Sequence, residues 1–409
     1  MTKTTFPKNK IRILLLEGIH PAAVKLFKDA GYDEPEVVRS AMDEAALEKK
    51  IGGYHLLGIR SKTQITGKVL EKADKLIALG CFCIGTNQVN MDAATSGGVA
   101  VFNSPFSNTR SVAELVIGHC IMLLRRIFEK SQAAHKGEWL KDSRNCFELR
   151  GKTLGIIGYG HIGSQVSVLA ESIGLKVIFY DVEPRLSLGN ALPATTLENL
   201  LRKSDIVSLH VPGNDGTKQL LNKARIGMMK DHAVLINLSR GDVMDTEAVT
   251  DALQSGKLGG AAVDVFPAEP EGAGDLFSSP LQKLPNVILT PHIGGSTVEA
   301  QENIGLDVAG KLISFLETGS SVGSLSVPAL SLPVIADAHR LLHIHKNVPG
   351  VLSEINGMLS AMKVNILGQY LKTNQDIGYV VLDIDRKTSS EVLDGLKKVR
   401  HTIKVRNLY

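Results

Sequence analysis

The sequence predicts an α/β protein with two parallel-sheet domains and a smaller C-terminal domain of βαββαβ order. Three features of the 409 residues support this prediction. Short β-branched runs alternate with amphipathic helices along most of the chain, a pattern typical of a parallel sheet covered on both faces. A glycine-rich turn at 152–163 joins one such run to a helix. From residue 339 onward the order becomes strand, helix, two strands, helix and strand.

The N-terminal part reads as short apolar strands separated by helices. The first strand is expected at 11–16, and Pro21 begins a helix that Gly31 ends. Further strands are expected at 36–38, 55–59, 76–79 and 99–102. Ligands of open parallel sheets bind beyond the carboxyl ends of the strands. The polar loops at 60–63 and 103–109 are therefore candidate substrate contacts, with ordinary solvated loops as the alternative.

The glycine-rich turn has the spacing of a dinucleotide-binding loop. Gly158 allows the strand to turn sharply, Gly160 removes a side chain where a pyrophosphate approaches, and Gly163 lets the helix pack closely on the sheet. The amino end of the helix then faces the phosphates. Asp181 follows the next apolar run, 18 residues after Gly163, where a carboxylate accepts ribose hydroxyls and repels a 2′-phosphate. NAD is thus predicted rather than NADP.

Polar groups follow four later strands of the same domain. The strands are expected at 206–210, 233–237, 260–264 and 287–290, and the polar groups at 210–212, 238–241, 264–270 and 291–295. Because parallel strands end at the same edge of their sheet, these four loops are predicted to converge on one cleft. This convergence is the strongest functional signal outside the glycine-rich turn.

Three connecting segments complete the chain. A single, largely apolar helix is expected at 109–128, and another at 297–315. Residues 319–336, rich in Ser, Gly and Pro, read as a linker. Trp139, the only tryptophan, lies in a polar stretch and suits a contact between domains or subunits.

Composition excludes several classes of protein. The chain is 44% hydrophobic and 22% charged, a balance typical of globular proteins. The net charge of +4 is small and scattered, which argues against nucleic acid as a partner, and no apolar run approaches the ~20 residues of a membrane span. Without a hydrophobic leader the chain is expected to be cytoplasmic. Cys81 and Cys83 lie in an apolar run without a companion cluster, so buried thiols and no metal site are expected.

Taken together, these motifs resemble the D-isomer-specific 2-hydroxyacid dehydrogenases. The resemblance rests on the glycine-rich turn and on residues 239–241, 264–270 and 291–295. Residues 80–89, residues 106–114 and the C-terminal unit are similar to the members of that family that act on D-3-phosphoglycerate and carry an ACT domain. The likeness runs from Ile11 to the C-terminus.

The resemblance implies a fold and its domain boundaries. A Rossmann-type nucleotide domain would be inserted in a flavodoxin-like substrate-binding domain, with a ferredoxin-like ACT regulatory domain at the end. The expected ranges are 1–108 with 296–330 for substrate binding, 109–295 for NAD binding and 337–409 for the ACT domain.

The resemblance also implies a reaction, the NAD-dependent oxidation of D-3-phosphoglycerate to 3-phosphohydroxypyruvate that opens L-serine biosynthesis. Reduction of 2-oxoglutarate is a further expected activity. His292 would be the acid/base, since imidazole titrates near working pH. Glu269 would fix the tautomer of His292, and Arg240 would hold the substrate carboxylate and polarise the 2-oxygen.

Ligand contacts are implied in the same way. The NAD contacts would be Gly158, Gly160, His161, Ile162, Gly163, Asp181, His210, Val211, Pro212, Leu238, Ser239, Arg240, Asp264, His292, Gly294 and Gly295. The substrate contacts would be Arg60, Ser61, Asn108, Arg39 and Lys141, with Arg60 the leading phosphate ligand and Lys141 supplied by a neighbouring subunit. Close relatives carry lysine at the position of Arg39.

The ACT domain implies feedback by L-serine, bound between paired copies by His345, Asn347 and Asn365. A homotetramer joined through its nucleotide and ACT domains is expected. Strongly serine-sensitive relatives carry a glycine pair at the hinge, where this chain has residues 335–338. Two other functions stay open: another D-2-hydroxyacid dehydrogenase, or a nucleotide-sensing interaction protein of the corepressor type.

Overall fold

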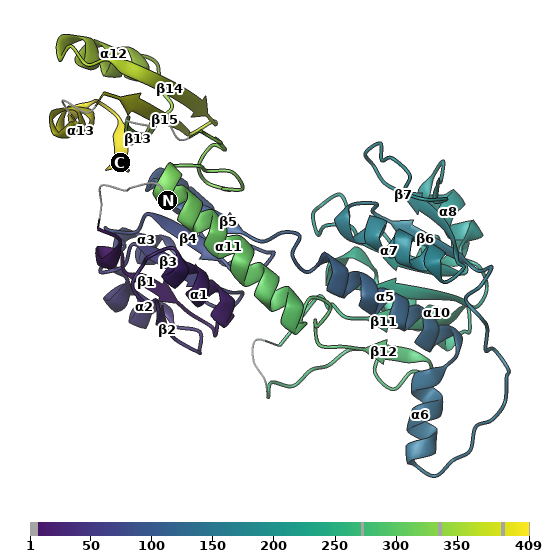
Figure 1. Cartoon of the computed structure of the whole chain (residues 1–409). Coiled ribbons are helices and arrows are strands. Elements are labelled where there is room, and N and C mark those ends of the chain that lie inside the picture. The colour runs from purple at the N-terminus through teal and green to yellow at the C-terminus, as the bar shows by residue number, and fades with distance from the viewer. Residues whose placement is uncertain (1–6, 271–273, 334–337, 386–388, 409) are drawn as a thin grey trace. The chain divides into compact units, whose positions relative to one another are not determined.

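A computed structural model describes residues 7–270, 274–333, 338–385 and 389–408 (Figure 1). The chain forms two compact units, one of Met1–Ser107 with Gln301–Tyr409 and one of Asn108–Ala300. Each unit is described by itself. Within the described segments, no helix combines the length and the apolar character of a membrane span.

The first unit contains a five-stranded parallel sheet. Its strand order is β2-β1-β3-β4-β5, the flavodoxin-like order. The strands are β1 (Ile13–Leu15), β2 (Glu36–Val37), β3 (Leu56–Ile59), β4 (Ala78–Cys81) and β5 (Ala100–Asn103). The intervening helices are the 3-10 helix η1 (Lys8–Lys10), α1 (Pro21–Asp29), α2 (Glu44–Ile51), α3 (Gly67–Glu71) and α4 (Met91–Ser96).

Helix α11 (Val298–Thr318) returns the chain to this sheet (Figure 1). Its residues Val308, Leu312 and Phe315 are buried in the same apolar cluster as Phe27 of α1 and Phe102 of β5. A separate cluster buries the opposite face of the sheet against α2 and α3. Burial on both faces explains why β1, β3, β4 and β5 read as continuous apolar runs.

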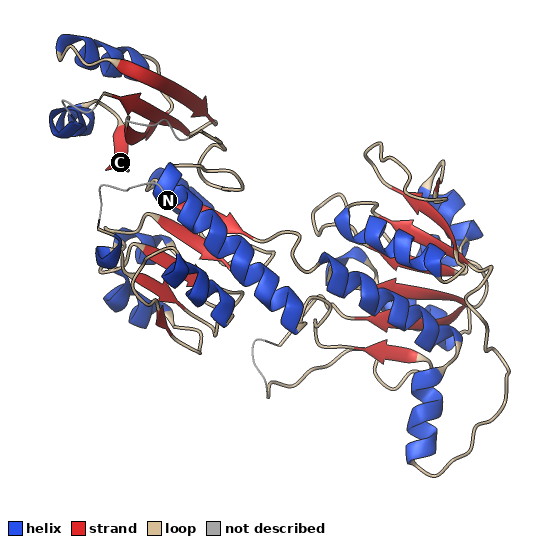
Figure 2. Ribbon diagram, in the orientation of Figure 1, coloured by secondary structure: helices blue, strands red, loops and turns tan. Residues whose placement is uncertain are grey.

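The second unit contains a seven-stranded parallel sheet, with helices on both faces (Figure 2). The strand order β12-β11-β10-β9-β6-β7-β8 is that of a Rossmann fold with an added strand. The strands are β6 (Thr153–Ile157), β7 (Lys176–Tyr180), β8 (Leu192–Pro193), β9 (Ile206–Leu209), β10 (Ala233–Asn237), β11 (Leu258–Val263) and β12 (Val287–Leu289). The helices are α5 (Thr109–Leu124), α6 (Ile127–His135), α7 (His161–Ser172), α8 (Leu197–Lys203), α9 (Lys223–Met228), η2 (Gly241–Val243) and α10 (Thr246–Gln254).

One predicted helix is wrong in extent. The expected helix at 109–128 divides into α5 and α6, because Arg126 adopts a left-handed conformation with φ of 51°. The amides of Arg125 and Arg126 bond the carbonyls of Ile121 and Leu123, which closes α5 before the chain turns. No glycine or proline marks this break in the sequence.

The C-terminal part of the first unit is a four-stranded antiparallel sheet of order β14-β15-β13-β16. Its elements are β13 (His339–Lys346), α12 (Val351–Ala361), β14 (Ile366–Thr373), β15 (Ile377–Ile384), α13 (Ser389–Lys398) and β16 (Thr402–Asn407). This is the predicted βαββαβ order, so the α/β fold class with its antiparallel C-terminal domain is confirmed. Residues 335–337 of the expected hinge lie outside the described residues.

Side chains of this domain bind the carboxyl end of α11. Arg340 is fully buried, forms a two-point ion pair with Asp383, and donates from Nη1 to the carbonyl of Thr318 at 3.0 Å. The Tyr379 hydroxyl donates to the carbonyl of Gly319 at 2.7 Å. These donors satisfy carbonyls that the end of a helix leaves without partners, and the positive charge complements the helix dipole.

His343, also on β13, is a buried histidine without an acidic partner among the described residues. Its Nε2 lies 2.8 Å from Thr402 Oγ1. Burial lowers the pKa of His343 to about 4, with a smaller contribution from neighbouring His345. The folded domain therefore holds this ring neutral.

Acidification from pH 7 to pH 5 is expected to weaken this domain. Unfolded histidine takes up a proton near pH 6.5, whereas folded His343 does so near pH 4. The contribution of the neutral His343 ring to the free energy of unfolding is therefore complete above pH 6.5 and is lost as the pH falls. At pH 5 the loss from this residue is about 2 kcal/mol. His343→Gln, which keeps a partner for Thr402, should reduce the difference in amide-exchange protection of β13 between pH 7 and pH 5. An unchanged difference in the variant would contradict this assignment.

Candidate active site

The glycine-rich turn joins β6 to α7. Gly158 has φ of 92°, and a Cβ there would lie 2.7 Å from the carbonyl oxygen of His210. A Cβ on Gly163 would lie 2.1 Å from the carbonyl oxygen of Gly158. At Gly160, the N-cap residue of α7, no described atom lies within 4 Å of a Cβ position. Two of the glycines thus permit close packing, and the third leaves the amino end of the helix open to an anion.

Replacing Gly160 by alanine is therefore expected to affect binding more than folding. The methyl group would stand where the pyrophosphate approaches and should weaken NADH binding roughly tenfold or more. Because φ at Gly160 is −80° and the space is open, the melting temperature without cofactor should change little. Titration calorimetry with NADH and thermal unfolding test both parts. Gly163→Ala is the contrasting variant and should lower the melting temperature. Unchanged NADH affinity in Gly160→Ala would refute this role.

Asp181 directly follows β7 and faces the glycine-rich turn. Its Oδ2 accepts a hydrogen bond from the backbone amide of Tyr159 at 2.8 Å, and Oδ1 accepts one from Glu183 at 2.9 Å. Arg185 Nε lies 3.6 Å from Oδ2. The backbone thus holds a carboxylate beside the glycine-rich turn, which is the arrangement predicted for Asp181.

Asn237, the last residue of β10, shapes the turn that carries Arg240. Its Oδ1 accepts hydrogen bonds from the amide of Ser239 at 3.0 Å and from Ser239 Oγ at 2.8 Å. Its Nδ2 donates to the carbonyl of Arg240 at 3.0 Å. A Cβ on Gly241 would lie 2.1 Å from the carbonyl carbon of Phe266, so this turn packs directly on the loop after β11.

Asp264, after β11, holds the loop after β12. Its Oδ1 accepts hydrogen bonds from Thr290 Oγ1 at 2.5 Å and from the amide of Ile293 at 2.8 Å. Its Oδ2 accepts one from the amide of Gly294 at 2.8 Å. Asp264 is 1% exposed, so its carboxylate acts inside the protein, on the Thr290 hydroxyl before His292 and on the two backbone amides after it.

His292 and Glu269 are in direct contact. The Nδ1 atom of His292 lies 2.7 Å from Oε2 of Glu269, whose Oε1 accepts a hydrogen bond from the amide of Phe266 at 3.0 Å. His292 has φ of 54°, and its side chain is 53% exposed. The carboxylate therefore fixes Nδ1–H, which leaves Nε2 as the ring nitrogen able to exchange a proton with a substrate.

The three predicted catalytic residues thus come from adjacent strands. Arg240 follows β10, Glu269 follows β11 and His292 follows β12, and these strands are neighbours in the sheet. Each strand is parallel to the next. An acid/base pair and a guanidinium group at one sheet edge can together bind a carboxylate and move a proton.

His210, predicted to contact the cofactor, turns its ring into the domain. Nε2 lies 2.9 Å from Ser208 Oγ, and Nδ1 is buried without a hydrogen-bond partner among the described residues. Burial lowers the pKa of His210 to about 4. Its backbone carbonyl is the part that adjoins Gly158.

The other predicted cofactor residues also lie at this sheet edge: His161 and Ile162 at the start of α7, Val211 and Pro212 after β9, Leu238 and Ser239 after β10, and Gly294 and Gly295 after β12.

The predicted substrate residues fall in both units. Arg39 follows β2, and Arg60 and Ser61 follow β3, all in the first unit. Asn108 belongs to the second unit, where a Cβ on Gly295 would lie 2.2 Å from its Nδ2. Asn108 Oδ1 is buried and has no hydrogen-bond partner among the described residues.

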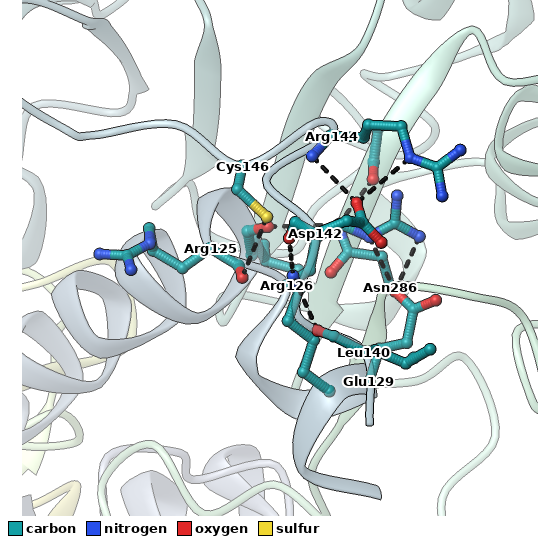
Figure 3. A network of polar contacts seen from close by, with 11 residues as sticks. Arg125, Arg126, Glu129, Leu140, Asp142, Arg144, Cys146 and Asn286 are labelled. Carbon is teal, nitrogen blue, oxygen red and sulfur yellow. Dashed lines mark hydrogen bonds and ion pairs between the residues drawn. The ribbon is translucent and has the colours of Figure 1, made fainter. Parts of the chain in front are cut away.

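Lys141 lies in an exposed segment that follows α6. Figure 3 shows polar contacts of this segment. Asp142 accepts a hydrogen bond from Arg144 within the segment. Lys130 Nζ of α6 donates to the carbonyl of Leu140 at 3.4 Å, and the Cys146 thiol donates to the carbonyl of Arg125 at 3.6 Å. Trp139, just before Lys141, has 84% of its surface exposed. The anchored segment thus presents a large aromatic group and a cation on the surface.

The predicted effector residues lie at opposite ends of the C-terminal sheet. His345 pairs with Gly378, whereas the carbonyl of Asn365 accepts the amide of Asp385 at 3.2 Å. Seven steps along a strand separate these positions by about 23 Å. Asn347 lies beside His345 and donates from Nδ2 to the carbonyl of Asn374 at 2.7 Å. One copy of the domain therefore does not bring the three side chains together.

Two residues that build this site were missed in the sequence. Asn237 is the last residue of β10 and Thr290 directly follows β12, and neither is among the predicted site residues. The signal for Asn237 was present, because an Asn followed two residues later by Ser is typical of an Asx turn. Thr290 gave no signal beyond its place next to Pro291.

Two family models match the chain. Residues 117–294 match "D-isomer specific 2-hydroxyacid dehydrogenase, NAD binding domain". Residues 341–404 match "AHAS small subunit-like ACT domain". The NAD-binding prediction and the ACT prediction are confirmed.

Curated relatives match over the full length. D-3-phosphoglycerate dehydrogenase of Escherichia coli strain K12 is 51% identical over 411 residues and covers 100% of both chains. The enzyme of the same name from Haemophilus influenzae is 50% identical, over 100% of this chain and 99% of its own. Among solved structures, D-2-hydroxyisocaproate dehydrogenase has a TM-score of 0.70 at 27% identity and covers 77% of this chain and 100% of its own.

Proposed function

The chain belongs to the D-isomer specific 2-hydroxyacid dehydrogenase family, and we propose that it oxidises D-3-phosphoglycerate to 3-phosphohydroxypyruvate with NAD, the first step of L-serine biosynthesis. The observation that carries the proposal is the Glu269–His292 contact of 2.7 Å on the strand next to that of Arg240. Full-length identity of 51% to an enzyme named D-3-phosphoglycerate dehydrogenase supports the choice of substrate.

The residues present fit the cofactor. Gly160 leaves the amino end of α7 open, and Asp181 stands at the end of β7 to take the ribose hydroxyls. NAD, when bound, accepts the hydride that leaves C2 of the substrate. The protein supplies the orientation, the proton acceptor and the charge that this transfer needs.

We propose the following roles in oxidation. Arg240 binds the substrate carboxylate with its planar guanidinium and polarises the 2-oxygen. His292 Nε2 takes the proton of the 2-hydroxyl as hydride leaves C2. The imidazolium that results is stabilised by Glu269 at Nδ1. Arg60 binds the phosphate, with Arg39 and the Lys141 of a neighbouring subunit as further phosphate ligands. Ser61 and Asn108 contact the carboxylate or the phosphate.

A spectrophotometric assay of NADH consumption tests the proposal. Turnover of 3-phosphohydroxypyruvate should exceed that of pyruvate by a large factor, with a weaker reduction of 2-oxoglutarate. NADH should be preferred over NADPH because of Asp181. Preference for an unphosphorylated 2-oxo acid would favour another 2-hydroxyacid dehydrogenase, and NADH binding without turnover would favour an interaction protein.

We further propose feedback by L-serine and assembly as a homotetramer. The amino acid would bind between two ACT domains, in contact with His345, Asn347 and Asn365. A site shared by two copies agrees with the finding that one copy does not bring these three side chains together. The exposed Trp139 and the exposed Ile366, Leu367 and Leu371 at the edge strand β14 are apolar surface that such an assembly would cover. Four free cysteines suit a reducing, cytoplasmic location. Sedimentation and L-serine titration of the activity test these points.

A further inference from the structure

The loop that carries Arg60 is held by two side chains from other parts of the first unit. The first is Glu17, which follows β1. Its Oε1 accepts a hydrogen bond from the amide of Thr63 at 2.8 Å, and its Oε2 accepts one from the amide of Lys62 at 3.1 Å. One carboxylate thus binds two consecutive amides directly after Arg60 and Ser61.

The second side chain is Gln88, which is 3% exposed. Its Nε2 donates to the carbonyl of Arg60 at 2.6 Å and also lies 3.4 Å from the carbonyl of Gly85. Gln88 therefore fixes the peptide of Arg60 itself, from the loop that follows β4. Glu17 and Gln88 together bind the loop on both sides of Ser61.

Glu17 occupies an unusual position for a carboxylate. It is 9% exposed, has φ of 62°, and has no ion-pair partner among the described residues. A buried charge and a left-handed backbone conformation each lower stability. Such features are retained only where other interactions of the folded protein hold the residue in place. Its hydrogen bonds are charge-assisted and therefore stronger than those of a neutral acceptor.

The same cluster includes Cys83. Burial raises the pKa of its thiol to about 11, a hydrogen bond from Gln88 acts in the opposite direction, Glu17 adds to the rise and Arg60 lowers it. The carboxyl ends of β1, β3 and β4 place these groups at one edge of the sheet.

We propose that Glu17 and Gln88 are positioning residues that fix the Arg60 loop in the conformation that binds the substrate phosphate. The inference rests on the proposed function, in which Arg60 is the phosphate ligand. A guanidinium group must be held in a fixed orientation to bind a phosphate at two points. Glu17 and Gln88 provide that orientation through the backbone, without contact to the substrate.

The test uses Glu17→Gln in the full chain. An amide offers one acceptor where the carboxylate offers two, so the loop loses a hydrogen bond at Lys62 or Thr63. The KM for 3-phosphohydroxypyruvate should rise roughly tenfold or more, while kcat and NADH affinity stay within about threefold. Glu71→Gln removes the same charge from exposed Glu71 of α3 and should leave all three values unchanged.

A double-mutant cycle with Arg60→Ala separates positioning from general structure. If Glu17 acts through Arg60, then Glu17→Gln should raise KM little further in the Arg60→Ala background. Additive effects on KM, or an unchanged KM in Glu17→Gln, would overturn the inference. If Glu17→Gln does not fold, Gln88→Met serves in the same cycle, because it keeps the side-chain volume and removes the donor to Arg60. Failure of the proposed function is distinguishable, since the unmodified protein would then not reduce 3-phosphohydroxypyruvate.

Discussion

His292→Asn should lower kcat for 3-phosphoglycerate oxidation by roughly 10³-fold, within the 10² to 10⁴ that general acid/base catalysis contributes. Asparagine tolerates the left-handed backbone of this residue, where φ is 54°, so the loop held by Asp264 should keep its shape. The amide has no group that accepts a proton near neutral pH. Hydroxyl deprotonation would then depend on water, although Arg240 still binds the carboxylate.

A matched control is available at His232. This histidine is also in the left-handed conformation, with φ of 62°, and it precedes β10, at the opposite end of that strand from Arg240. His232→Asn is therefore the same substitution in the same backbone conformation, and activity should be retained. Stopped-flow hydride transfer and fluorescence titration with NADH provide the two readouts. Near-native turnover of His292→Asn with normal NADH binding would show that His292 is not the acid/base.

The sequence predicts the candidate pair Glu269 and His292 better than it predicts the structure around them. Glu269 and His292 could be named because each follows an apolar run and because the motifs resemble a known family. Asp264 is predicted to contact the cofactor, and the structure adds a second role, because its carboxylate accepts hydrogen bonds from Thr290, Ile293 and Gly294. The role of Asp264 in holding this loop depends on which backbone amides after β12 point toward its carboxylate. The order of residue types along the chain does not specify this.

Local rules explain both the correct and the wrong predictions of the fold. The parallel arrangement of the strands follows from alternating apolar runs and helices, since parallel strands need crossover connections that are usually helical. The division at Arg126 was missed because two arginines in succession are good helix formers and no breaker is present. No role for Glu17 is predicted, for a similar reason. A Glu-Gly pair after an apolar strand is typical of a solvated turn, and only the tertiary fold brings the Glu17 carboxylate to the amide of Thr63.

Arg240→Lys should reduce kcat/KM roughly 10²-fold or more, the second large effect expected at this site. The guanidinium can donate two parallel hydrogen bonds to a carboxylate, and a charged hydrogen bond contributes about 1.5–3 kcal/mol. Lysine keeps the charge but lacks the planar fork, so one bond and the fixed orientation are lost. The Asn237 side chain bonds the backbone at 239 and 240, not the side chain of Arg240, so the turn should survive the substitution.

Arg202→Lys is the control, because Arg202 is an exposed residue of α8 in the same unit. The decisive comparison is between kcat and KM in Arg240→Lys. If Arg240 polarises the 2-oxygen as well as binding the carboxylate, then kcat should fall together with kcat/KM, because that interaction strengthens as charge develops on the oxygen. A rise in KM at constant kcat would limit Arg240 to ground-state binding. Unchanged values of both would remove Arg240 from the substrate site and leave the polarising role to another donor at this edge of the sheet.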